Sequence, residues 1–140
     1  MSLTWVNGVA ADTVPADDRG LNYADGAFET LSCHEGSIQH KDLHRTRLTR
    51  SLSELGVSSA AEHSERLFEE AGRCLETAGY TGVARLTVTR GSGPRGYAPP
   101  APPQLRSILR AYSMSESLSA LRCGIATSRW ATQPQLAGLK

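Results

Sequence analysis

The sequence has 140 residues, of which 39% are hydrophobic and 21% charged, and a formal net charge of +1. This composition is typical of a soluble globular protein with one modest core. The small net charge gives no electrostatic reason to expect nucleic acid or an anionic membrane as partner, and no apolar stretch is long enough to span a bilayer. The first residues lack the pattern of a secretory signal. Three widely spaced cysteines, Cys33, Cys74 and Cys123, fit free thiols, so we expect a cytoplasmic protein.

The N-terminal third of the chain alternates strand and turn signals. Residues 3–9 predict a short hairpin that turns at an Asn-Gly pair, the strongest dipeptide signal for a tight turn. Residues 12–26, rich in Asp, Gly, Pro and Asn, predict a long ordered loop. A strand is expected over residues 27–33, followed by a Glu-Gly turn and a short return strand near Ile38.

Two helices are predicted in the middle of the chain. The first begins near Asp42, which suits an N-cap, and ends at Gly56. The second begins at Ser59-Ala60-Ala61-Glu62, the pattern of a capping box, and ends at Gly79. Apolar residues recur at helical spacing in both segments: Leu48, Leu52 and Leu55 in the first, and Leu67, Phe68, Ala71, Cys74, Leu75 and Ala78 in the second.

Strand signals return in the last third. In residues 84–89 apolar and polar side chains alternate, which predicts a half-buried strand. The prolines of residues 99–103 predict a rigid extended loop. Two more strands are expected over residues 105–112 and 123–127, joined by a linker over residues 113–120. This order of elements indicates an α+β fold, with two helices packed on one face of a mostly antiparallel sheet.

Residues 91–96, Gly-Ser-Gly-Pro-Arg-Gly, match the G-x-G-x-x-G pattern of dinucleotide-binding proteins. That fingerprint requires a helix to open at the third glycine, so that its N-terminus can hold a pyrophosphate. Here Tyr97, Ala98 and two prolines follow, and a helix that opened at the third glycine could not run through that proline cluster. A loop that positions Arg90, Arg95 and Tyr97 would suit a small polycarboxylate, because arginine binds carboxylates through paired hydrogen bonds. The alternative is a solvated turn with surface arginines.

Four segments carry a resemblance to a known family. They are residues 18–30 (DRGLNYADGAFET), 44–48 (HRTRL), 90–97 (RGSGPRGY) and 136–140 (LAGLK). Three of them resemble the motifs of the class IV, or fold type IV, pyridoxal-phosphate enzymes: D-R-G-x-x-Y/F-G-D-G-x-F-E-T, H-x-x-R-L and L-A-G-x-K. One departure is Ala24, where glycine is usual and where alanine tolerates only negative φ without cost.

Within this group, residues 90–97 are most similar to the loop of the 4-amino-4-deoxychorismate lyases, and the aminotransferases generally differ there. The resemblance implies the N-terminal domain of the D-amino-acid aminotransferase-like fold. It also implies a pyridoxal-phosphate-dependent lyase that eliminates pyruvate to give 4-aminobenzoate for folate synthesis. Two alternatives stay open: a D-amino-acid or branched-chain aminotransferase, and a non-catalytic α+β module that only associates with a partner.

The resemblance implies roles for individual residues. Lys140 would form the Schiff base with pyridoxal 5'-phosphate and transfer protons, with assistance from the hydroxyl of Thr30. Arg47 would bind the cofactor phosphate. The implied substrate-binding residues are Tyr23, Arg90, Arg95 and Tyr97.

Some of these residues have an ordinary structural interpretation as well. Taken alone, Arg47 is typical of an exposed helix residue and Tyr23 of a packing residue. His40 and His44 are four apart, as zinc ligands on a helix can be, but no third ligand cluster accompanies them. We therefore expect no metal, and histidines that are exposed to solvent or cap the helix. The joint occurrence of the motifs in the right order favours the functional interpretation.

The resemblance also implies a domain division. Residues 1–112 would form the N-terminal domain, 113–121 the linker, and 122–140 the first strands of a second domain. In the family, the acid at the pyridine nitrogen and the phosphate-binding helix follow the lysine. The native protein is thus expected to be longer, or the chain to break at a modified lysine, and the fragment alone to be inactive. Family members are homodimers, so we expect the partner subunit to hold the glycine- and proline-rich segment 91–103.

Overall fold

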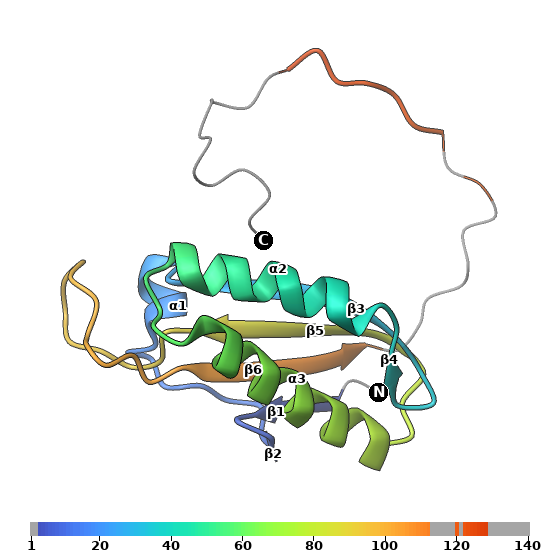
Figure 1. Cartoon of the computed structure of the whole chain (residues 1–140), viewed down its shortest axis with the longest axis horizontal. Coiled ribbons are helices and arrows are strands. Elements are labelled where there is room, and N and C mark those ends of the chain that lie inside the picture. The colour runs from blue at the N-terminus through green and yellow to red at the C-terminus, as the bar shows by residue number, and fades with distance from the viewer. Residues whose placement is uncertain (1–2, 113–119, 121, 129–140) are drawn as a thin grey trace.

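Six antiparallel strands form a single sheet in the computed structural model, which describes residues 3–112, 120 and 122–128 (Figure 1). Their order across the sheet is β2-β1-β6-β5-β3-β4. The strands are β1 (Leu3–Val6), β2 (Val9–Ala10), β3 (Gly26–His34), β4 (Ser37–Ile38), β5 (Gly82–Thr89) and β6 (Arg106–Tyr112). The predicted hairpins are confirmed, because β1 pairs with β2 and β3 pairs with β4.

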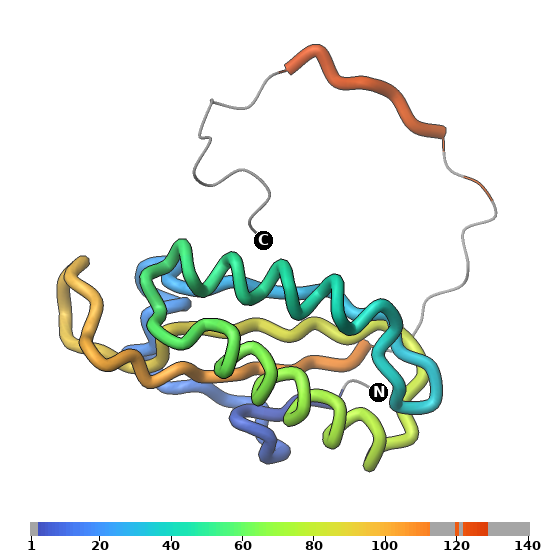
Figure 2. Tube along the Cα trace, in the orientation of Figure 1, coloured from blue at the N-terminus to red at the C-terminus, as the bar shows by residue number. Residues whose placement is uncertain are grey.

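Two long helices cover one face of this sheet, as Figures 1 and 2 show. They are α2 (Lys41–Glu54) and α3 (Ala60–Thr77). A buried apolar cluster fills the space between the helices and the sheet. Its largest members are Leu31, Leu48, Leu52, Phe68, Leu75, Leu86 and Val88. The predicted α+β class is thereby confirmed, with both helices on the same side.

In the described part of the chain, no long helix covers the opposite face of the sheet (the open face). Along β5, Ala84, Leu86 and Val88 are buried beneath the helices, whereas Arg85 and Thr87 are on the other side. The predicted alternation is confirmed except at its end, where Thr89 is buried. On β3 the same alternation buries Glu29 and leaves its neighbour Thr30 exposed. Adjacent side chains of β3 therefore project from opposite faces of the sheet.

The two long helices begin where the sequence predicts, but three local details differ from the predictions. Residues 12–26 contain a short helix, α1 (Arg19–Tyr23), whose N-cap Asp18 accepts a hydrogen bond from the amide of Gly20. Helix α2 has His40 as its N-cap, and Asp42 lies in the first turn, where its negative charge interacts favourably with the helix dipole. Ser59 is the N-cap of α3, but its φ of 52° is left-handed and its side chain makes no capping bond. The capping box requires an extended N-cap residue.

Residues 123–127 were predicted as a strand, and this prediction was wrong. The segment has no strand in the structure and Ile125 is fully exposed, because none of the described segments lies beside it to complete a ladder. The predicted linker falls outside the described residues apart from residue 120, and Lys140 also lies outside them. Within the described part of the chain, no helix is long and apolar enough to cross a membrane.

Candidate functional site

A buried carboxylate on β3 holds the arginine predicted to bind the cofactor phosphate. Glu29 is 1% exposed and accepts hydrogen bonds from Arg47 at both oxygens, with 2.7 Å between Arg47 Nε and Glu29 Oε1. His44 Nδ1 lies 2.7 Å from Glu29 Oε2. The motif spacing explains the contact, because residues 44 and 47 are three apart on α2 and share one face of the helix. His44 therefore contacts a carboxylate, contrary to the expectation of a solvent-exposed or capping histidine.

The charges of this cluster stabilise one another. Burial would raise the pKa of Glu29, but the hydrogen bonds and charges of Arg47 and His44 together outweigh it and hold the pKa below its usual 4.5. The hydrogen bond to Glu29 in turn raises the pKa of Arg47.

One side of the Arg47 guanidinium remains available. Glu29 occupies Nε and Nη2, whereas Nη1 makes no hydrogen bond to the described residues and the side chain is 38% exposed. A guanidinium with free donors and a fixed orientation suits a phosphate dianion. The position of Arg47 therefore fits the cofactor phosphate, although its role stays a prediction.

A second carboxylate, four residues earlier, holds two arginines. Asp25 accepts from Arg19 Nε at 2.8 Å, and from Arg90 Nε at 3.1 Å to Oδ1 and 2.9 Å to Oδ2. Arg90 is only 6% exposed and also donates to the carbonyl of Leu55. These contacts place Arg90 in the support of the loop that follows β5. Direct binding of substrate by Arg90 stays a prediction that its contacts do not support.

The DRG motif ties α1 to the ends of β5 and β6. Asp18 caps α1, accepts from the hydroxyl of Thr89 at 2.9 Å and is ion-paired with Arg106. A Cβ at Gly20 would lie 2.3 Å from a side-chain carbon of Thr89, so only glycine permits this approach. Ala24 ends α1 with a left-handed φ of 53°, where the glycine usual in the family would be unstrained.

The Gly91–Tyr97 loop rests on α1. Arg19 donates to the carbonyls of Gly96 at 3.0 Å and Tyr97 at 3.1 Å, and the Tyr23 hydroxyl accepts from the Gly96 amide at 2.9 Å. The Tyr23 and Tyr97 rings meet edge to face with 5.6 Å between centroids. The expectation that only a partner subunit holds this segment is therefore corrected for residues 91–97, since the chain holds them itself.

Two side chains of the loop stay largely exposed, those of Arg95 and Tyr97. Arg95 is exposed and makes no hydrogen bond or ion pair with the described residues, and Tyr97 is 89% exposed. Tyr23, predicted to bind substrate, has its hydroxyl on the loop backbone instead. As in the sequence prediction, no helix follows the glycine-rich segment, which argues against a dinucleotide site.

Thr30 lies on the open face of the sheet, on the other side of β3 from Arg47. Its cross-strand neighbour is Arg85, whose guanidinium carbon lies 3.9 Å from the centroid of the Phe28 ring and which pairs with no carboxylate among the described residues. Strand β4 pairs only with the last two residues of β3. A ligand that contacts both Thr30 and Arg47 must therefore lie along the unpaired edge of β3.

Sequence reasoning missed Glu29 and Arg85. Glu29 belongs to the family motif, and its place at a buried position of an alternating strand could have indicated a charged partner. Arg85 lies between two buried residues of β5, so its exposure on the open face could have been read from the alternation. An apolar groove of about 470 Å³ runs from α1 along this face and includes Leu21, Phe28 and Arg85.

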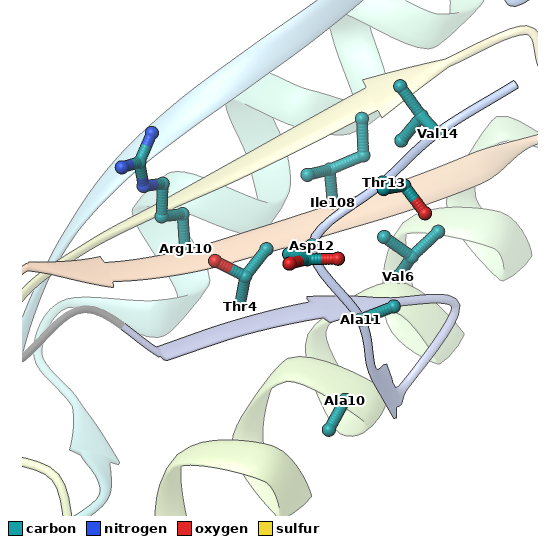
Figure 3. Close-up of a pocket in the computed structure, with 9 residues that line it drawn as sticks. All are labelled: Thr4, Val6, Ala10, Ala11, Asp12, Thr13, Val14, Ile108 and Arg110. Atoms are coloured by element: carbon teal, nitrogen blue, oxygen red, sulfur yellow. The ribbon is translucent and has the colours of Figure 1, made fainter.

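A larger groove of about 810 Å³ adjoins the apolar groove on the same face and shares Val14 and Ile108 with it; it lies between strands β1 and β6 and the segment that follows β2 (Figure 3). It contains Arg110 and Asp12 but none of the residues predicted to form the site. Across residues 3–112 and the short described segments beyond, no three metal-ligating side chains lie together. The candidate site is thus the β3 edge together with α1 and its loop.

Comparison with known proteins agrees with these motifs. The family model described as Amino-transferase class IV matches residues 26–140. The aminodeoxychorismate lyase of Vibrio harveyi is 28% identical over 142 residues, which cover 97% of this chain and 51% of that protein. A D-alanine aminotransferase of Staphylococcus epidermidis is 28% identical over 120 residues, covering 82% of this chain and 42% of that protein.

Among solved structures, the 4-amino-4-deoxychorismate lyase of Pseudomonas aeruginosa superimposes with a TM-score of 0.70 and 40% identity. The match covers 76% of this chain and 38% of that chain. The chain spans about half the length of the curated relatives it matches. It belongs to the class IV aminotransferase family, whose members are pyridoxal-phosphate-dependent enzymes.

Proposed function

We propose that this chain is the N-terminal part of a pyridoxal-phosphate-dependent 4-amino-4-deoxychorismate lyase. The observation that carries the proposal is the Gly91–Tyr97 loop, whose backbone is fixed on α1 while Arg95 extends from it without a partner among the described residues. A fixed loop with a free guanidinium suits a carboxylate of the substrate. The likeness to two aminodeoxychorismate lyases supports the same choice.

The cofactor would be held by two residues of this chain. Arg47, oriented by Glu29, would donate to the phosphate through its free Nη1, and Lys140 would hold the cofactor covalently. When bound, pyridoxal phosphate supplies an electron sink for the bond cleavage. The Nζ of Lys140 would accept the α-proton of the substrate and later return a proton. The hydroxyl of Thr30, a residue of β3, would assist this proton transfer.

The substrate would be positioned by Arg95 and Tyr97, and the enzyme would act as a homodimer. Arg95 supplies paired donors for a carboxylate, and Tyr97 offers an aromatic face and a hydroxyl. The loop segment beyond Tyr97 has no secondary structure up to Arg106, so a partner subunit can still cover it. In the proposed dimer, the partner subunit would therefore contact only the part of the segment that follows Tyr97.

The reaction itself separates the candidates. The full-length protein should release pyruvate from 4-amino-4-deoxychorismate with no 2-oxo acid added. The D-alanine aminotransferase relative motivates the second candidate, and strict dependence on an added 2-oxo acid would establish transamination instead. Absence of both activities from a cofactor-loaded protein would favour a non-catalytic module.

Two substitutions test the cofactor residues. In the full-length protein, Lys140→Ala should abolish the visible absorbance of the lysine-bound cofactor and lower activity by several powers of ten. Lys41 is the only other lysine in this sequence, so Lys41→Ala is the matched control. Retention of the absorbance in Lys140→Ala would contradict the assignment.

Arg47→Ala should weaken cofactor affinity by roughly tenfold or more, because a charge-assisted phosphate contact is lost. It should slow the cofactor-saturated enzyme much less. Arg66→Ala, on the exposed side of α3, is the control that should leave cofactor affinity unchanged. An unchanged affinity for Arg47→Ala would leave Arg47 as a structural partner of Glu29 only.

A further inference from the structure

The residues of α1 support the loop from both sides of Arg95. On one side, the backbone amide of Arg19 donates to the carbonyl of Gly91 at 2.8 Å, and a Cβ at Gly93 would lie 2.9 Å from Arg19 Cδ. On the other side, Arg19 donates to the carbonyls of Gly96 and Tyr97. The loop is therefore fixed before and after Arg95, whose side chain has no hydrogen-bond or ion-pair partner among the described residues.

Arg19 is itself held in place by other contacts. It is 2% exposed, bonds to Asp25 through Nε, and its guanidinium carbon lies 4.6 Å from the centroid of the Tyr23 ring. All three nitrogens of its guanidinium donate to this protein. Because Arg19 is buried and already bonds to protein through each nitrogen, a ligand has no access to it, and its contribution to binding must act through the loop.

Tyr23 completes this support with a neutral hydrogen bond. Its hydroxyl accepts a hydrogen bond of 2.9 Å from the amide of Gly96, which is the residue directly after Arg95. Gly96 has a φ of 121°, a conformation that glycine adopts readily and L side chains rarely do, so the turn directly after Arg95 requires a glycine. The phenol oxygen is positioned to fix the orientation of the peptide between Arg95 and Tyr97.

We infer that Arg19 and Tyr23 are positioning residues that hold the backbone on both sides of Arg95, so that its guanidinium is presented to a substrate carboxylate in one orientation. This inference rests on the proposed function of the loop. It replaces the predicted direct contact of Tyr23 with substrate. Pre-ordering of the loop lowers the conformational entropy lost when the substrate binds.

Tyr23→Phe is the sharpest variant, because it removes only the phenol oxygen and keeps the ring that contacts Arg19 and Tyr97. In the full-length enzyme it should raise the KM for 4-amino-4-deoxychorismate about three- to tenfold, the loss of one hydrogen bond, with kcat little changed. In an Arg95→Ala background the same change should have no further effect on KM, because the side chain it positions is absent.

Tyr80→Phe is the matched control. The Tyr80 hydroxyl bonds to the backbone as well, as a donor to the carbonyls of Val83 and Tyr112, but Tyr80 precedes β5 whereas the loop follows it. Its KM should equal that of the wild type. A Tyr23→Phe effect that is the same with and without Arg95 would overturn the positioning role.

A readout without substrate tests the support separately. Hydrogen exchange of the Gly96 amide should be faster in Tyr23→Phe and unchanged in Tyr80→Phe, measured by NMR or by mass spectrometry of loop peptides. Unchanged exchange at Gly96 would overturn the inference even if the enzyme is a lyase. Loss of protection in a protein without lyase activity would instead support the α1 contacts and refute the proposed function.

Discussion

Asp25 and Glu29 lie four residues apart in one motif, and both are carboxylates that hold arginines, yet the two clusters leave different groups free. The arginines bound by Asp25 are 2% and 6% exposed and have further protein partners. The arginine bound by Glu29 is 38% exposed and keeps one nitrogen without a protein partner in the described structure. Asp25 therefore builds a support, whereas Glu29 orients a group that can still take a ligand.

The difference arises from what surrounds each guanidinium. Arg19 and Arg90 are buried between α1, the loop and the end of α2, where each also donates to a backbone carbonyl. Arg47 projects from α2 beside the edge of β3, where β4 pairs only with the last two residues of the strand. An ion pair alone thus does not tell a structural arginine from a ligand-binding one; here the exposure of the side chain distinguishes them.

Removal of the Asp25 charge should have the largest effect on stability. Asp25→Asn leaves two buried arginines without a counter-charge, and breaking a buried ion pair typically costs about 3–5 kcal/mol. The free energy of unfolding from urea denaturation is the measurement. Asp17→Asn, the same change at an exposed residue of the preceding segment, should stay within about 0.5 kcal/mol. A similarly small loss for Asp25→Asn would show that the support does not depend on charge.

Glu29→Gln should lower the free energy of unfolding by less than Asp25→Asn, about 1.5–3 kcal/mol, because Arg47 can reach water once it loses its partner. Cofactor affinity should also fall, since the guanidinium loses its fixed orientation. The control is Glu65→Gln, which weakens the more exposed pair of Glu65 with Arg45 and should cost about 0–1 kcal/mol. If Glu29→Gln destabilises the protein as much as Asp25→Asn, the two clusters do not differ in the way proposed.

Acid should weaken both clusters. Burial favours protonation of each carboxyl, but the arginine partners together outweigh it, so the pKa of Asp25 lies below its usual 3.8 and that of Glu29 below 4.5. A lowered folded-state pKa contributes stability above the unfolded pKa, which is lost as pH falls through the folded pKa. Between about pH 5 and pH 3, the melting temperature of the wild type should therefore fall more than that of Glu29→Gln. Parallel curves would contradict the contribution of Glu29.

The sequence was sufficient for elements whose pattern is local. The alternation around Leu86 and the apolar spacing of α2 and α3 predicted a strand and two helices, because burial on one side imposes a period on the residues. It was insufficient at helix starts. Ser59 has the right chemistry for a cap, but its left-handed backbone, set by the preceding turn, keeps the hydroxyl from the amide.

The same limit applies to the site. The motifs identified the loop and Arg47, but they did not show which side chains are used by the protein itself. Arg90 and Arg95 have the same chemistry and lie in one glycine-rich segment, and only the fold places Asp25 beside one of them. For Tyr23, whose contact with substrate stays a prediction, the sequence gives no sign that the Gly96 amide donates to its hydroxyl.

Arg95→Ala should have the smallest effect on stability and a clear effect on binding. Arg95 is exposed and without a partner in the described residues, so its loss should change the free energy of unfolding by less than about 0.5 kcal/mol. The KM of the full-length enzyme for 4-amino-4-deoxychorismate should rise at least roughly tenfold, the loss of about one charged hydrogen bond, while cofactor absorbance stays unchanged. Arg90→Ala, five residues earlier, should have the opposite pattern: it should lower the free energy of unfolding more than Arg95→Ala does and change KM less. If Arg95→Ala leaves KM intact, the loop has no part in recognition, and the choice of lyase over aminotransferase loses its physical basis.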